Sequence, residues 1–193
     1  RISPGLTKAD IDALATGGYD ALFAAAADAR LAVFVAIPGN APVLRSSIER
    51  FPDVQFVIDH CGLPVSREAL EATLRSLGWN EQAPEFSDET PEAALANVLK
   101  LAHLPNVAIK WAHAQKAFDI SDYPFPGLRR HLRSALDAFG ADRIMWASDI
   151  SANKSGNSWA ELLFWLIDNP DLSQAQREAI LGGTARRILN WPK

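Results

Sequence analysis

The sequence predicts an α/β fold built on a parallel β-sheet, and three observations support this prediction. Four apolar runs, rich in β-branched and aromatic residues, lie at 31–37, 54–58, 107–111 and 143–147. These runs are nearly continuous rather than alternating, which is typical of strands that are covered on both faces. Segments with helical spacing of apolar residues separate the runs, and strands that alternate with helices indicate a parallel sheet.

The segments between the apolar runs carry signals for helix starts. Segment 7–30 begins at Thr7, a good N-cap residue, and its second half is rich in alanine. Segment 90–105 begins at Thr90, and Pro91 suits the first helical position. The other predicted helices cover 40–52, 126–140, 158–170 and 172–191.

Two segments do not fit this alternation of strands and helices. Residues 78–91 are polar and long enough to form a loop over a site. The first seven residues, 1–7, resemble the end of a strand that enters a loop. We therefore expect an N-terminal portion of the fold to precede this chain.

Composition excludes several classes of function. The net charge is −4 and the isoelectric point is about 5.6, whereas a nucleic-acid surface needs a basic face. The longest apolar runs are too short to span a bilayer. Cys61 is the only cysteine, so an internal disulfide is excluded and a reducing compartment is expected. We predict a cytoplasmic protein without a nucleic-acid or membrane partner.

Ionisable residues follow the predicted strands at the points where those strands end. Asp149 follows the last strand, His60 the second and His113 the third, while Lys110 lies near the end of the third. Arg1 stands at the end of the initial strand stub. The carboxyl ends of parallel strands meet at one edge of the sheet, where ligands bind. These five residues are therefore the candidate site.

Each candidate also has a structural interpretation. His60 and His113 could serve only as hydrogen-bonding residues of the fold, and Lys110 could extend its ammonium group to solvent. Asp59 is expected to point away from His60 and to brace the neighbouring helix. Cys61 is expected to be a small buried residue rather than a nucleophile.

Together, these strand ends resemble those of the amidohydrolase-related family often called amidohydrolase 2. The resemblance is collinear over nearly the whole chain. It implies a (β/α)8 TIM-barrel-like fold in which residues 1–193 form a single barrel domain covering about strands 4 to 8, with the first strands absent. The matching stretches are RIS at the start, 51–64, 104–112, 139–150 and 180–189.

The same resemblance implies roles for the candidate residues. Asp149 would shuttle a proton between the attacking water and the leaving group, and would bind a divalent metal where one is present. His60 would polarise the substrate carbonyl or orient water. Arg1 and Lys110 would pair with a substrate carboxylate, and His113 is grouped with them as substrate-binding.

The resemblance leaves the cofactor open. The family's His-x-His pair on its first strand does not occur in this sequence, and the run 31–37 lacks the metal-binding histidine that some branches carry there. We therefore weigh one divalent ion, Zn or Mn, against a metal-independent enzyme.

The predicted function is a hydrolase that opens a lactone, or a related cyclic ester or amide, of a small carboxylated substrate by Asp-assisted attack of water. One alternative is a metal-dependent non-oxidative decarboxylase of the same family. Another is a non-catalytic barrel fragment that acts as a binding or assembly module. A partial barrel would expose sheet edges and apolar surface, so we also expect a homo-oligomer.

Overall fold

The computed structural model describes residues 1–64, 71–72, 75–76, 78, 90–120, 122–150 and 157–191. Most of the polar segment that we interpret as a loop over the site, 78–91, lies outside these ranges. Within them, no helix is long and apolar enough to cross a membrane.

The prediction of a parallel α/β sheet is confirmed. Each of the four strands lies inside one predicted apolar run, and they pair in sequence order, β1-β2-β3-β4, all parallel. Ile2 adds an isolated parallel bridge to Val35, so the initial stub lies beside the first strand. The strands are β1 Val33–Val35, β2 Phe56–Ile58, β3 Val107–Trp111 and β4 Ile144–Trp146.

Helices connect these strands, and the predicted helix starts at Thr7 and Thr90 are confirmed. The Thr7 side chain accepts a hydrogen bond from the backbone N–H of Asp10, and Thr90 accepts one from Ala93. The α-helices are α1 Lys8–Ala15, α2 Asp20–Asp28, α3 Arg45–Arg50, α5 Pro91–Leu99, α6 Ala114–Ala117, α7 Leu128–Phe139, α8 Trp159–Ile167, α9 Gln174–Glu178 and α10 Thr184–Ile188.

Two predicted helices are interrupted. Segment 7–30 forms α1 and α2 rather than one helix, because Gly17 adopts a φ of 86° between them, a conformation that ends a helix. Segment 172–191 forms α9 and α10, separated by a π-helical stretch at Ala179–Gly183.

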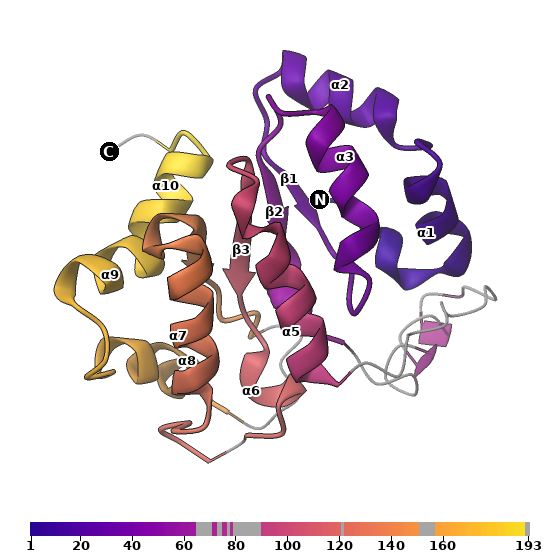
Figure 1. Ribbon diagram of the computed structural model, residues 1–193. Helices are drawn as coiled ribbons and strands as arrows, with labels where there is room; N and C mark the ends of the chain where they lie inside the picture. The colour runs from indigo at the N-terminus through magenta and orange to yellow at the C-terminus, as the bar shows by residue number, and fades with distance from the viewer. Residues whose placement is uncertain are drawn as a thin grey trace.

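The sheet has two unequal faces. Helices α3, α5 and α7 cover one face (Figure 1), where Ile58, Ile109 and Ile144 are fully buried in the main core. The other face carries a small cluster: Phe34, Val57, Ala108 and Met145, with Ala32 and with Ala185 and Ile188 of α10. Residues i and i+2 of a strand share a face, so Lys110 lies on the same face as Ala108. The candidate residue Lys110 therefore lies on the smaller face of the sheet.

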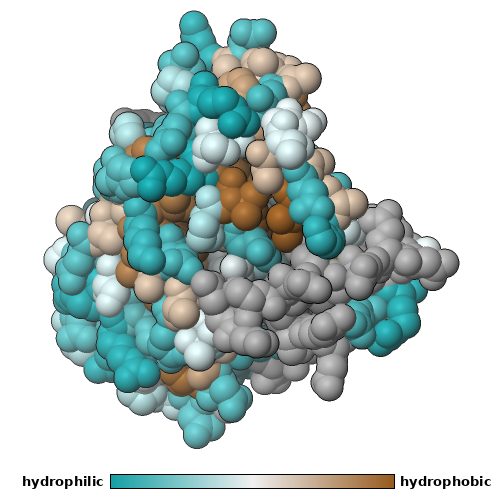
Figure 2. Space-filling model, turned by 45° about the vertical axis from the view of Figure 1, so that its right-hand side comes forward, coloured by the Kyte–Doolittle hydropathy of each residue, from teal (hydrophilic) through white to brown (hydrophobic). Residues whose placement is uncertain are grey.

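The described part of the face shown in Figure 2 is mostly hydrophilic, and apolar side chains gather in a hollow on it. Large apolar residues that remain more than half exposed in the described chain include Leu31 and Trp191.

Candidate active site

Three of the predicted site residues adopt an unusual backbone conformation. His60 lies in the 3-10 turn Asp59–Gly62 after β2, His113 precedes α6, and Asp149 follows β4. Their φ angles are 51°, 58° and 46°. Positive φ is uncommon for residues other than glycine, and such residues cluster at functional sites because the surrounding structure must hold them there.

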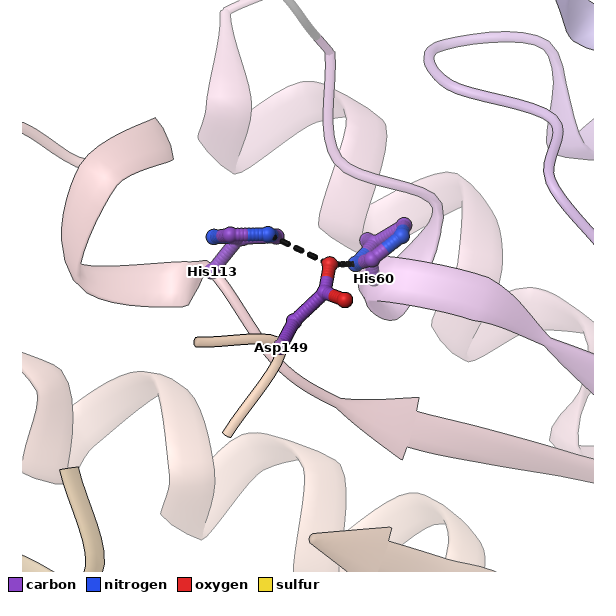
Figure 3. A group of neighbouring side chains, drawn as sticks. All are labelled: His60, His113 and Asp149. Atoms are coloured by element: carbon purple, nitrogen blue, oxygen red, sulfur yellow. Dashed lines mark hydrogen bonds and ion pairs between the residues drawn. The ribbon is translucent and has the colours of Figure 1, made fainter. Parts of the chain in front are cut away.

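These turns bring the three side chains together around one carboxylate oxygen (Figure 3). Oδ2 of Asp149 lies 2.6 Å from Nε2 of His113 and 3.5 Å from Nδ1 of His60. The two imidazole rings are adjacent, with centroids 4.9 Å apart. Both of these contacts are made by Oδ2. The two histidines therefore order the carboxylate through this oxygen.

Arg1 and Lys110 meet at a second carboxylate, that of Asp59. Its Oδ2 lies 2.8 Å from Nε of Arg1, and its Oδ1 lies 2.7 Å from Nζ of Lys110. The Asp59 side chain is completely buried, whereas 14% of the Lys110 side chain and 50% of the Arg1 side chain are exposed. The expectation that Asp59 braces a helix is therefore wrong, because its carboxylate neutralises the two predicted anchor cations.

The sequence contained the signal for this contact. In the parallel register Val57 lies beside Ala108, and two residues further along the chain stand Asp59, directly after β2, and Lys110 in β3. Residues at this spacing point to the same face of the sheet.

Arg1 also links the two carboxylates. Its Nη2 lies 3.4 Å from Nε2 of His60. A guanidinium group only donates hydrogen bonds, so Nε2 of His60 must be the acceptor. The chain of contacts therefore runs from Asp59 through Arg1 and His60 to Asp149.

The electrostatics favour a neutral His60 beside an ionised Asp149. Burial, with a further contribution from the charge of Lys110, lowers the pKa of His60 to about 4. Burial alone would raise the pKa of Asp149, but His60, His113 and Lys110 outweigh it, and the pKa of Asp149 is lowered. At neutral pH the Asp149 carboxylate is therefore ionised.

The lowered pKa of His60 predicts a pH dependence of stability. Between its usual value of 6.5 and about 4, the unfolded chain takes up a proton on His60 that the folded protein does not. The free energy of unfolding should therefore fall as the pH falls through this window. Thermal melting of wild type and His60→Asn across this range checks it, since asparagine tolerates positive φ and does not titrate. A difference in melting temperature between the two proteins that stays constant across this pH range would contradict the lowered pKa of His60.

Cys61 is buried, as expected, and it does not provide a nucleophile. Burial raises the pKa of its thiol to about 12, so the thiol stays protonated at neutral pH. The thiol donates a weak hydrogen bond to the carbonyl of Lys110, 3.5 Å from Sγ, and ties the end of β2 to β3.

His60, His113 and Asp149 form a group that could hold a metal, with ligand atoms within 4.8 Å of one another. Two imidazoles and a carboxylate suit zinc. A metal-bound imidazole, however, almost always donates its second N–H to an acceptor. Nε2 of His60 faces the Arg1 guanidinium, a donor, and Nδ1 of His113 is buried with no recorded partner in the described residues. The donor atoms match a metal site, but their surroundings do not.

The family pattern, described as amidohydrolase, matches residues 4–191, so the chain belongs to this family, and the resemblance inferred from the sequence is confirmed.

Two curated relatives with similar sequences are lactonases. The chain is 30% identical over 158 residues to the L-fucono-1,5-lactonase of Burkholderia multivorans, covering 75% of this chain and 49% of that protein. It is 28% identical over 136 residues to the L-fucono-1,5-lactonase of Burkholderia ambifaria, covering 67% and 37%. The chain thus spans about half or less of the curated relatives that it matches.

A solved structure supports the fold. The crystal structure of an amidohydrolase from Burkholderia multivorans with bound zinc matches with a TM-score of 0.73 at 23% identity. The match covers 98% of this chain and 64% of that chain.

Proposed function

We propose that this chain provides the residues for proton transfer in a lactone-opening hydrolase whose complete fold is a (β/α)8 barrel. The observation that carries the proposal is the Asp149 carboxylate, which is ionised and held by two histidines at the carboxyl ends of neighbouring strands. Two lactonases among the relatives support the choice of a cyclic ester.

The proposed reaction has two proton transfers. Asp149 Oδ1 accepts a proton from water as the water oxygen attacks the lactone carbonyl carbon. When the ring C–O bond breaks, Asp149 returns that proton to the leaving oxygen. The product is a hydroxy acid, which ionises at neutral pH and releases one proton to solvent for each ring opened.

The histidines act by ordering Asp149. His113 makes the shorter contact with Oδ2, and His60 makes the longer one. Both ring nitrogens of His60 already face Asp149 or Arg1. This arrangement supports orientation of the carboxylate by His60 more than direct contact with the substrate carbonyl.

Arg1 is the better candidate to stabilise the oxyanion. Half of its side chain is exposed, and its guanidinium has more N–H donors than its contacts with Asp59 and His60 use. Lys110 is mostly buried, and its ammonium group is bound by Asp59.

The charge balance supports a neutral lactone as the substrate. The cations of Arg1 and Lys110 are matched by the carboxylates of Asp59 and Asp149, so the group carries no surplus positive charge for an additional substrate carboxylate. We therefore propose sugar-acid lactones as the substrate class.

A panel of lactones tests the proposal. Intact protein should accelerate proton release from neutral sugar-acid lactones, measured in a pH-stat, more than from lactones that carry a free carboxylate. The decarboxylase alternative predicts release of carbon dioxide from aromatic carboxylic acids instead. Carbon dioxide release without lactone opening would refute the proposed function.

The surroundings of His60 predict a reaction that needs no metal. Protein dialysed against a strong chelator should keep its lactonase activity within about twofold, with proton transfer by side chains alone. Metal analysis of the dialysed protein provides the control. Loss of activity that returns with added zinc would show that the imidazoles rearrange to bind the ion.

A further inference from the structure

Asp59 is a completely buried carboxylate that takes no direct part in the proposed reaction. Burial of a charge is costly unless the charge is paired, so its two short ion pairs require an explanation beyond packing. One of these pairs leads to the site, because the same guanidinium that binds Asp59 also reaches His60.

The geometry fixes the Arg1 guanidinium at two points. Nε binds Asp59 at 2.8 Å, and Nη2 reaches Nε2 of His60 at 3.4 Å. Because half of the Arg1 side chain is exposed, it would be free to turn toward solvent without the contact to Asp59. Because the guanidinium is planar, its contact with the buried Asp59 carboxylate also fixes where its other N–H groups meet the His60 ring.

This contact determines where the ring proton of His60 lies. A neutral imidazole has one N–H and one acceptor nitrogen, and the hydrogen bond at one nitrogen selects the state of the other. With Nε2 accepting from Arg1, the proton lies on Nδ1, which faces Oδ2 of Asp149 at 3.5 Å.

We propose that Asp59 is a positioning residue that acts through Arg1 to hold His60 in the Nδ1–H tautomer, so that an N–H, rather than a lone pair, lies 3.5 Å from Oδ2 of Asp149. With the opposite tautomer, a lone pair of Nδ1 would face the carboxylate and repel it. Asp149 would then keep only its contact with His113, and the orientation of Oδ1 toward water would be less well defined.

The kinetic part of this inference rests on the proposed function, but its structural part does not. The tautomer can be read from the ¹⁵N shifts of the His60 ring in intact protein labelled with ¹⁵N-histidine, without any substrate. Wild type should show His60 as the Nδ1–H form at neutral pH.

Two variants test the link. Arg1→Lys keeps a cation for Asp59 but loses the planar fork, and Asp59→Asn removes the charge that holds Arg1. Both should move His60 toward the Nε2–H form. The Asp59→Asn variant should lower kcat about tenfold to a hundredfold, as expected when a residue that orients an active-site side chain is lost. Arg45→Lys, which alters an exposed ion pair with Glu49, should change neither the shifts nor the rate.

The outcomes separate the two proposals. An Nε2–H tautomer in wild type, or an Nδ1–H tautomer that persists in both variants, would overturn the positioning role. Should Asp59→Asn fail to fold, Arg1→Lys alone decides the tautomer question. If the tautomer responds as expected and no lactone is opened, the proposed function fails and the positioning role of Asp59 stands.

Discussion

Replacing Asp149 with asparagine should lower kcat for lactone opening by about 10²–10⁴-fold, the usual contribution of a general base. The amide cannot accept the proton of the attacking water, although it fills the same volume. Asparagine also tolerates positive φ, so the φ of 46° at this position should persist. Steady-state kinetics of the intact protein, with a thermal melt of the same sample, measure both effects.

The control for this prediction is the variant Asp168→Asn. Asp168 is an acidic residue at the C-terminal end of α8 and lies outside the site. It should keep the activity of wild type. A near-wild-type kcat in the Asp149 variant would contradict the role of Asp149, whereas loss of folding would show that its contacts with the histidines are structural.

Replacing Asp59 with alanine should destabilise the protein by about 3–5 kcal/mol, because it leaves the mostly buried Lys110 ammonium group without its counter-charge. Urea unfolding of wild type and variant gives the difference in the free energy of unfolding. Adding Lys110→Ala to this variant should recover part of the loss, because the unpaired cation is then removed.

Glu49→Ala provides a matched control for that experiment. Glu49 forms an ion pair with Arg45 at 2.8 Å, a distance similar to those at Asp59, but both side chains are exposed. Exposed pairs contribute about 1 kcal/mol or less. Equal losses for Asp59→Ala and Glu49→Ala would contradict a buried, structurally important pair.

The strands and helix starts could be predicted because they depend on local signals. Apolar runs define β1 to β4, and the hydroxyls of Thr7 and Thr90 cap their helices as expected. The interruption after α1 was missed, although Gly17 and Gly18 lie at that point, because the apolar pattern continues on both sides.

The site was harder to predict than the fold. Its residues could be named because they follow the strands, but their contacts depend on positive φ at His60, His113 and Asp149, which no local sequence preference requires. The expectation for Asp59 was wrong because it assumed that His60 continues the strand and that Asp59 therefore points to the opposite side. The alternation of side chains continues only as far as Asp59, because His60 adopts a positive φ and leaves the strand conformation.

The most direct test of the account is a single turnover in H₂¹⁸O, with intact protein in excess over a sugar-acid lactone and mass spectrometry of the hydroxy acid. Water activated by Asp149 and attacking the carbonyl predicts a single ¹⁸O atom in the new carboxylate. An unlabelled carboxylate would show that a protein oxygen attacks first, and label in the released hydroxyl would show cleavage of the other ring C–O bond; either result would contradict the mechanism.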